Sequence, residues 1–361
     1  MERGLGRLKK EVLSHWLCTA CGACAGLCPY IVTLEDRVAG VGECRESDGD
    51  CFRFCPRTGP VEGEGDSGLH GDAGYGGPVG SYESTGIARS GRRSDGFQYG
   101  GAVTALMIRA LRDGVIDAAV LTTMGKTGPK TITATTEEEI RACAGSKYAV
   151  APTVSEVNRV RRGFGGRLGV VALPCQVTAL RKISEAEGQE ASGTIALIVG
   201  LFCTWALTQR GWGALLGEEP GPDDLGRVDI PPPPADVMEV DLRGERLSLP
   251  LREVKEHIRP ACRVCLDMTA ENADISVGTV EGREGWSTLV IRTKVGRELV
   301  ERAGSQGDLE REELDQERWR HLQDASLGKK ERAIASAEVE GDMEPLPFLL
   351  AVSRVKEQIQ R

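Results

Sequence analysis

The first 55 residues contain seven of the twelve cysteines of this 361-residue chain, and no other feature constrains its N-terminal fold as strongly. They are Cys18, Cys21, Cys24, Cys28, Cys44, Cys51 and Cys55. The same segment has few large apolar residues, so it needs metal ligation or cross-links to fold. The charged N-terminus is not followed by the apolar stretch of a secretory signal, so we expect a cytoplasmic protein with reduced thiols. Metal binding is therefore expected rather than disulfides.

The spacing Cys-x2-Cys-x2-Cys-x3-Cys-Pro in the first run is typical of iron–sulfur clusters of the bacterial ferredoxin type. In such runs three cysteines bind one cluster and the fourth binds the next one. A degenerate second copy of the run ends in Cys51-x3-Cys55-Pro56. Crossed ligation then predicts one 4Fe-4S cluster held by Cys18, Cys21, Cys24 and Cys55. The alternative is zinc, although zinc sites usually combine two separated Cys-x2-Cys pairs.

A second cluster in this segment is predicted from the remaining cysteines, Cys28, Cys44 and Cys51, which are one thiolate short of four. Asp48 stands three residues before Cys51, where the ferredoxin run has a cysteine, and it can supply an oxygen ligand. A 3Fe-4S cluster, which needs only three thiolates, is the other possibility. The alternative to two clusters is a single cluster with spare thiols.

Four parts are predicted along the chain: a ferredoxin-like iron–sulfur module (1–62), a Gly-rich linker (63–94), a main domain (95–305) and a helical C-terminal extension (306–361). In the main domain strands alternate with helices, and several strands, such as residues 168–173 and 194–202, are apolar throughout. That pattern predicts an α/β domain with a mixed sheet core covered on both faces. Thr136 is expected to cap a helix. The extension, including residues 309–319, is expected to be helical and to face solvent or a partner.

Composition excludes several function classes. The net charge of −9 argues against a nucleic-acid-binding surface, which would be basic. Only four histidines are present and no Ser/His/Asp arrangement stands out, so acid–base hydrolysis is not expected. The longest apolar runs reach about ten residues, too short for a membrane span.

Four of the remaining cysteines stand at positions suited to a further site. Cys175 and Cys203 follow two predicted buried strands, and Cys262 and Cys265 form a Cys-x2-Cys pair. Strand ends are the usual ligand-binding positions of an α/β sheet. A further 4Fe-4S cluster, a zinc site and plain core thiols are all compatible with this spacing.

Several segments resemble the family of beta subunits of coenzyme F420-reducing hydrogenases and F420-dependent formate dehydrogenases. They are "SDGFQYGGAVTALMIRALRDGVIDAAVL", "CAGSKYAVAP", "VVALPCQVTALRK", "LIVGLFC" and "CRVCLDMTAENADISVGTVEGREGWSTLVIRT", and they span roughly residues 94–300 in the family's order. The resemblance implies one 4Fe-4S cluster beside an FAD, with the cluster held by Cys175, Cys203, Cys262 and Cys265. Cys143 falls outside these positions and is expected to be a core thiol.

The FAD is implied by the resemblance alone, because no Gly-x-Gly-x-x-Gly fingerprint is present. The candidate residues are Gly100, Gly101, Thr104, Ser146, Lys147, Pro174 and Gln176. The glycine pair opens a helix whose free N–H groups favour phosphate, and the Ser-Lys pair offers a hydroxyl and a cation. The two neighbours of Cys175 are candidates to lie between flavin and cluster. A tight turn and a surface lysine are the plainer interpretations of the glycine pair and of Lys147.

Together these parts predict an electron-transfer oxidoreductase subunit. Coenzyme F420 exchanges a hydride, a cluster moves single electrons, and a flavin does both. The resemblance implies a partner of hydrogenase, formate dehydrogenase or heterodisulfide-reductase type, and the N-terminal clusters favour the last two. The alternatives are an F420-independent FAD relay that exchanges electrons with ferredoxin, a reductase of another small substrate, and a zinc-stabilised binding protein.

Overall fold

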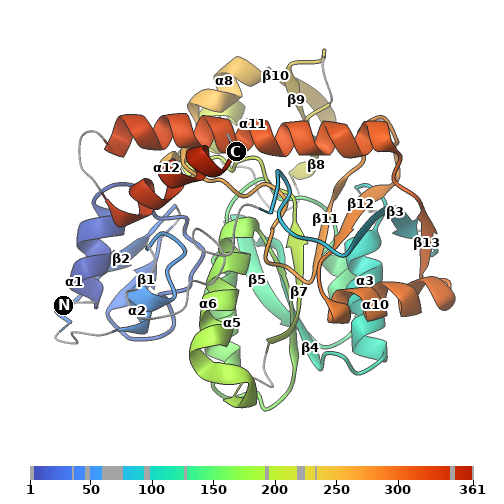
Figure 1. Ribbon diagram of the computed structural model, residues 1–361, viewed down its shortest axis with the longest axis horizontal. Helices are drawn as coiled ribbons and strands as arrows, with labels where there is room; N and C mark the ends of the chain where they lie inside the picture. The colour runs from blue at the N-terminus through green and yellow to red at the C-terminus, as the bar shows by residue number, and fades with distance from the viewer. Residues whose placement is uncertain are drawn as a thin grey trace.

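A mixed sheet of eight strands forms the centre of the protein (Figure 1). The computed structural model describes residues 4–34, 36–44, 49–58, 76–92, 98–125, 128–191, 195–217, 224–231, 234–341 and 346–359. The strands are β3 (Ser84–Ser90), β4 (Ala118–Gly125), β5 (Gly128–Ala134), β6 (Leu168–Ala172), β7 (Ile195–Leu201), β11 (Ile275–Thr279), β12 (Ser287–Ile291) and β13 (Leu309–Glu312). Their order across the sheet is β13-β3-β12-β11-β7-β6-β4-β5. The predicted α/β class with a mixed sheet is confirmed.

The four central strands of the sheet run parallel. β4 pairs with β6, β6 with β7, and β7 with β11, whereas β5, β12, β3 and β13 are antiparallel to their neighbours. The carboxyl ends of the four parallel strands therefore lie along one edge of the sheet. That edge is where an α/β sheet normally binds its ligands.

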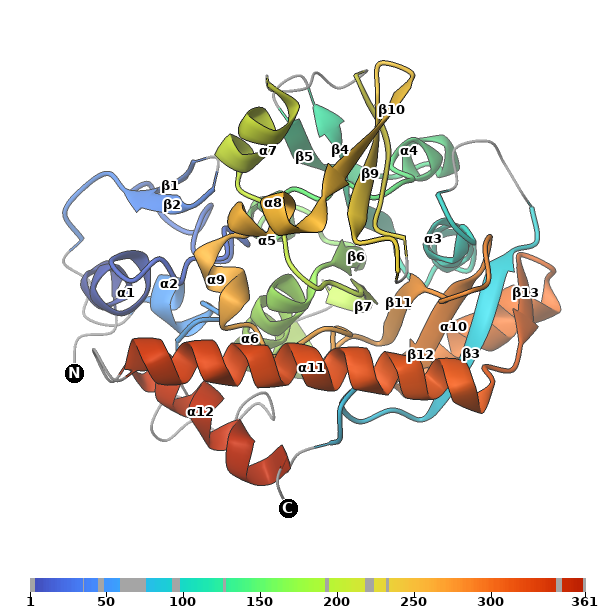
Figure 2. The same cartoon turned by 90° about the horizontal axis from the view of Figure 1, so that it is seen from above.

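Helices cover both faces of this sheet (Figure 2). α3 (Ala102–Arg112) and α10 (Lys294–Ser305) lie on one face, and α5 (Thr153–Arg161) and α6 (Pro174–Ala191) on the other. Side chains of β7 alternate between the two cores: Leu197 and Val199 pack with α3 and α10, and Ile198 packs with α5 and α6. This alternation explains why the strand is apolar at every position. α4 (Glu137–Ala142) begins at Thr136 with a capping box, so the predicted cap is confirmed.

A smaller sheet and short helices stand beside the main one. Its strands are β8 (Leu225–Asp229), β9 (Val237–Leu242) and β10 (Glu245–Pro250), in the order β10-β9-β8. Trp212 and Val254, from α7 (Gln209–Leu216) and α8 (Leu251–Glu256), share a core with Val228 and Val240 of this sheet. The next helix, α9 (Pro260–Arg263), carries one of the cysteines discussed below.

The N-terminal segment shares one core with the C-terminal extension. It contains α1 (Leu5–Leu8), a π-helical turn at Lys9–Leu13, β1 (Ile31–Thr33), β2 (Val38–Gly40) and α2 (Asp50–Arg53). Leu8 and Phe52 pack with Ile334 of α11 (Gln316–Gly341) and Phe348 of α12 (Pro347–Ile359). Figures 1 and 2 show α11 running across the molecule from the region of β3 to that of α1. The extension was expected to face solvent or a partner, but part of it is buried against the N-terminal segment of the same chain.

Two segments differ from the sequence-based expectation. Residues 84–90, assigned to the linker, form β3 inside the main sheet, and residues 309–312, expected to be helical, form its edge strand β13. These two strands pair with each other, so each gains backbone hydrogen bonds from a partner distant in sequence. Such pairing outweighs the weak local preferences of short segments.

Residues 59–75, which include the first part of the linker, lie outside the described residues. No helix among those described has both the length and the apolar character to cross a bilayer.

Candidate functional site

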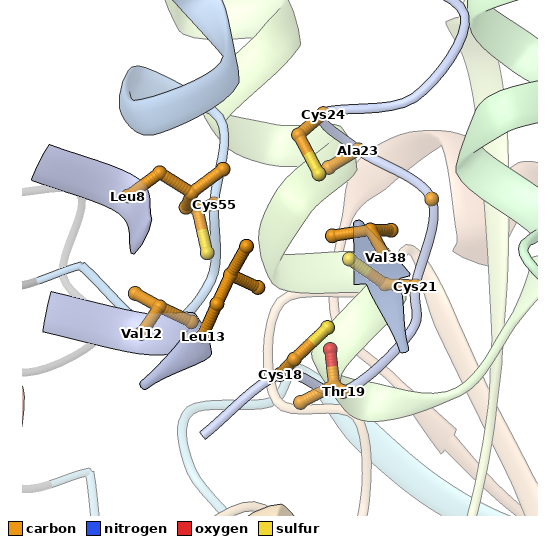
Figure 3. Close-up of a pocket in the computed structure, with 11 residues that line it drawn as sticks. Leu8, Val12, Leu13, Cys18, Thr19, Cys21, Ala23, Cys24, Val38 and Cys55 are labelled. Atoms are coloured by element: carbon orange, nitrogen blue, oxygen red, sulfur yellow. The ribbon is translucent and has the colours of Figure 1, made fainter. Parts of the chain in front are cut away.

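Four N-terminal cysteines surround a pocket between the cysteine loop and the first helix (Figure 3). They are Cys18, Cys21, Cys24 and Cys55, which we call the first cysteine group. Their sulfur atoms point into the space between them, which is about 280 Å³ including its open side. Leu8, Val12, Leu13 and Val38 form apolar walls. Burial raises the pKa of Cys21 to about 12, with a smaller contribution in the same direction from the neighbouring Cys55.

The main domain holds the loop of the first cysteine group in place. Gly22 has φ +88°, and a Cβ there would lie 2.6 Å from the backbone nitrogen of Ser155. The side-chain amide of Asn158, fully buried on α5, donates hydrogen bonds of 2.9 Å to the carbonyls of Ala23 and Ala25. The buried guanidinium of Arg259 donates to the carbonyl of Thr19 at 2.7 Å. The loop conformation therefore depends on residues far along the chain.

A second cysteine group consists of Cys28, Cys44 and Cys51. Burial raises the pKa of Cys51 to about 11, and the charges of Cys28 and Cys44 add to the effect, so the three thiols are neighbours. Cys28 thus lies with a different set from the other three cysteines of its run. Cys51 also raises the pKa of Cys24, after burial and the other thiols of the first group, so the two groups adjoin. Asp48, the predicted fourth ligand, lies outside the described residues.

The third cysteine group lies at the carboxyl edge of the main sheet. It consists of Cys175, Cys203, Cys262 and Cys265. Cys175 is the second residue of α6, which follows β6, Cys203 follows β7, and the other two lie in and just after α9. Burial raises the pKa of Cys175 to about 12, and the next contributions come from Cys21 and Cys265. Burial also raises the pKa of Cys203, where the other three members of the group contribute.

Two buried cations face the third cysteine group. Arg57 is 5% exposed and lies close enough to Cys265 for the two charges to interact, and Lys329 of α11 is 4% exposed. Burial acts to raise the pKa of Cys265, but the charges of Lys329 and Arg57 reverse this and lower it. Sequence reasoning missed both residues. Arg57 follows the Cys55-Pro56 end of the cysteine run, whereas nothing in the sequence around Lys329 indicates its role.

The cysteine groups are spaced more widely than a single metal ion requires. Within the described ranges, no three His, Cys, Asp or Glu side chains lie close enough together to hold one ion. Zinc draws its sulfur ligands to about 2.3 Å from one point. The thiols of the first cysteine group, arranged around a pocket, instead fit a polynuclear cluster, whose several iron atoms each take one thiolate.

The two segments predicted to bind flavin phosphate lie next to each other. The backbone nitrogen of Ser146 donates to the side chain of Gln98 at 2.7 Å, which places it beside the Gly100–Gly101 pair. Gly101 has φ +70° and begins α3, and no side chain caps this helix within the described residues. A Cβ at Gly100 would lie 2.7 Å from the carbonyl oxygen of Ala88. The uncapped N–H groups of α3 fit an anion, while Gly100 is also required by packing.

The other candidate flavin residues already have protein partners. Lys147 Nζ donates to the carbonyls of Cys143, Ala144 and Gly145 just beyond α4, and burial lowers its pKa to about 8. Gln176 is 2% exposed and bonds Ala151, Thr153 and the backbone of Leu173 through its amide. Pro174 begins α6, and Thr104 is buried on α3. Cys143 is half-buried against the main core, apart from the three cysteine groups.

Tyr148 is a further residue that sequence reasoning missed. Burial raises its pKa to about 12, and the nearby charges of Asp229 and Cys203 contribute. The residue directly follows the Ser146–Lys147 pair, so it connects the predicted flavin segments to the third cysteine group. Its position beside that pair is the only signal in the sequence.

Comparison with known proteins covers most of the chain. The family described as "Coenzyme F420 hydrogenase/dehydrogenase, beta subunit" matches with its N-terminal part at residues 86–158 and with its C-terminal part at residues 165–317. The "Coenzyme F420 hydrogenase subunit beta" of Methanosarcina barkeri is 33% identical over 61% of this chain and 77% of its own. The protein of the same description from Methanothermobacter thermautotrophicus is 31% identical over 65% of this chain and 86% of its own.

A solved structure is similar as well. A chain of the F420-reducing [NiFe] hydrogenase complex from Methanosarcina barkeri superimposes with a TM-score of 0.67 and 29% sequence identity. The match covers 74% of this chain and 95% of the other. Cys175, Cys203, Cys262 and Cys265 all fall within the residues that match the C-terminal part of the family, whereas the first two cysteine groups precede both matched ranges.

Proposed function

This chain belongs to the coenzyme F420 hydrogenase/dehydrogenase beta-subunit family of oxidoreductases, and from that premise we propose that it converts hydride transfer into single-electron transfer. The segments around Gly100–Gly101 and Ser146–Lys147 would hold an FAD that exchanges hydride with coenzyme F420. The cysteine groups would hold the iron–sulfur clusters that carry single electrons to or from a partner subunit. FAD, when bound, supplies the step between the two-electron and one-electron carriers.

The observation that carries this proposal is the order in which the three cysteine groups adjoin. Cys51 of the second group acts electrostatically on Cys24 of the first, and Cys21 of the first acts on Cys175 of the third. Clusters held by these groups would therefore form one continuous series. A series that begins at the sheet edge and continues into the N-terminal segment suits a protein that exports single electrons.

The proposed ligands follow from the geometry of each group. The first and third cysteine groups each offer four thiols for a 4Fe-4S cluster. The second group offers three, for a 3Fe-4S cluster or for a 4Fe-4S cluster completed by Asp48. The uncapped start of α3 and the adjoining Ser146–Lys147 segment are the proposed flavin-binding region, with Pro174 and Gln176 on the side of Cys175.

A partner subunit is part of the proposal. The two relatives compared above are each named as the beta subunit of a hydrogenase, and the similar solved chain comes from a hydrogenase complex. We propose for this chain a catalytic partner of hydrogenase, formate dehydrogenase or heterodisulfide-reductase type. The second cysteine group lies at the far end of the proposed series from the sheet edge, so it is the proposed exit.

The test is anaerobic turnover of the full-length chain loaded with flavin and iron–sulfur clusters. Reduced coenzyme F420 is the donor, a viologen dye is the one-electron acceptor, and both are followed by absorbance. We expect oxidation of F420 coupled to reduction of two viologens per hydride, and loss of viologen reduction in Cys265→Ser. Absence of F420 oxidation together with rapid exchange with reduced ferredoxin would reject this function in favour of an F420-independent relay.

A further inference from the structure

Two buried cations, Arg57 of the N-terminal segment and Lys329 of the C-terminal extension, lie beside the third cysteine group. Arg57 is 5% exposed, directly follows the Cys55-Pro56 end of the N-terminal cysteine segment, and lies close enough to Cys265 for the two charges to interact. Lys329 is 4% exposed on α11, and its Nζ donates to the carbonyls of Cys203 at 2.6 Å and Asp267 at 2.7 Å. Both residues lie outside residues 86–317, within which the two family matches fall.

Neither cation is neutralised by an ion pair in the described part of the chain. The guanidinium of Arg57 donates to the carbonyl of Ala261 at 2.8 Å and lies over the ring of Phe348, while its buried Nε has no hydrogen-bond partner there. Among the described residues, the hydrogen-bond partners of Lys329 are two backbone carbonyls. The carboxylate that faces Lys329 is that of Asp267, which also acts on Arg292.

The neighbouring lysine of α11 is different. Lys330 is equally buried, but it forms an ion pair with Glu271. Its charge is thus compensated locally. Arg57 and Lys329 are thus two buried cations that act on Cys265 and have no ion pair among the described residues, and their combined effect on the Cys265 thiol exceeds the opposing effect of Asp267.

We propose that Arg57 and Lys329 raise the reduction potential of the cluster at Cys175, Cys203, Cys262 and Cys265. One-electron reduction adds a negative charge to the cluster, and a buried cation stabilises that added charge through a medium of low dielectric constant. The N-terminal segment and the C-terminal extension therefore do more than add clusters and cover them. They set how readily the cluster at the sheet edge accepts an electron. This inference rests on the proposed ligand set of that cluster.

The test is a redox titration of the full-length, cluster-loaded chain, followed by electron paramagnetic resonance. Iron per chain and the spectrum of Cys265→Ser first identify the signal of the third group. In Lys329→Met and Arg57→Gln we expect the midpoint potential of that signal to become more negative. A tenfold change in the reduction equilibrium corresponds to about 59 mV for one electron, and we expect at least that from each variant. The other signals should shift less.

Matched variants separate charge from structure. Arg57→Lys keeps the charge and should keep the midpoint, and Arg332→Gln removes an exposed charge from the same helix as Lys329 and should also leave it unchanged. Unchanged midpoints in both neutral variants, with iron content retained, would overturn the inference and leave the proposed function standing. If both neutral variants lose iron and none of the remaining signals shifts, the two cations have a structural role only, and the inference about the reduction potential is overturned too. No third-group signal in the wild type would overturn the ligand set itself.

Discussion

Cys21, in the N-terminal loop, lies close enough to Cys175, at the start of α6, for its charge to raise the pKa of the Cys175 thiol. Burial is the larger cause of that raised pKa, and Cys21 is the next contributor. The two residues belong to different cysteine groups and to parts of the chain that are far apart in sequence. Their proximity places the first and third proposed clusters next to each other.

Substitution of Cys21 by serine tests whether electrons pass through the first cluster. We expect Cys21→Ser to lose about four iron atoms per chain, because the first group then has three thiols. Flavin reduction by F420 should persist, while transfer to an acceptor at the second group should fall by at least tenfold. Cys143→Ser is the control, because that thiol packs against the main core, apart from the three groups. Equal losses in both variants would contradict this assignment.

The contiguous cysteine run is predicted to serve two clusters. Cys28 lies with Cys44 and Cys51, whereas Cys24 lies with Cys21 and Cys55. We therefore expect Cys28→Ser and Cys24→Ser to abolish different signals in electron paramagnetic resonance. If both substitutions remove the same signal, the run binds a single cluster.

The glycine at position 22 should be required for docking of the cysteine loop. An alanine Cβ there would lie 2.6 Å from the backbone nitrogen of Ser155 and 2.7 Å from the carbonyl oxygen of Pro152. We expect Gly22→Ala to lower the free energy of unfolding by about 2–5 kcal/mol, the sum of the costs of a left-handed backbone and of an overpacked contact. Chemical denaturation of the cluster-loaded chain measures this.

Gly244→Ala is the matched control for that substitution. Gly244 has φ +85°, almost that of Gly22, but an added Cβ would have no heavy atom within 4 Å. Gly244→Ala should lower the free energy of unfolding by about 1–2 kcal/mol, the cost of the left-handed backbone conformation alone. Equal costs in the two variants would show that the contact with the N-terminal end of α5, at Pro152 and Ser155, does not restrict the cysteine loop.

The lowered pKa of Lys147 predicts that the stability of the folded chain depends on pH. Burial lowers its pKa from 10.5 to about 8 in the folded chain. Between these values the unfolded chain binds more protons than the folded one, so stability rises with pH through this window. Its three carbonyl partners favour the charged form and reduce the effect, so we expect a gain of about 1 kcal/mol. Thermal unfolding at pH 7.5 and 9.5 should show the gain in the wild type and not in Lys147→Met; parallel changes in both would contradict it.

Much of the main domain could be predicted because its signals are local. The apolar strand predicted at residues 194–202 and the Thr136 cap both follow from side chains within one element. The structure has the strand as β7, Ile195–Leu201, and the capped helix as α4. β3 and β13 could not be predicted in this way. Neither has a strong apolar pattern of its own. Their pairing with each other, and that of β3 with β12, supplies the backbone hydrogen bonds that keep them extended.

The sequence by itself determined the kinds of chemistry available to this protein: the spacing of its cysteines, the alternation of strands and helices, and the motifs of residues 94–300. Only the tertiary structure decided which thiols are neighbours across the chain, and that Arg57 and Lys329 are buried beside Cys265. The physical reason is the range of the interactions. Ligand spacing within a loop and hydrophobic period are properties of adjacent residues. The neighbours of Cys175 depend on how the sheet edge, the N-terminal loop and α11 pack together.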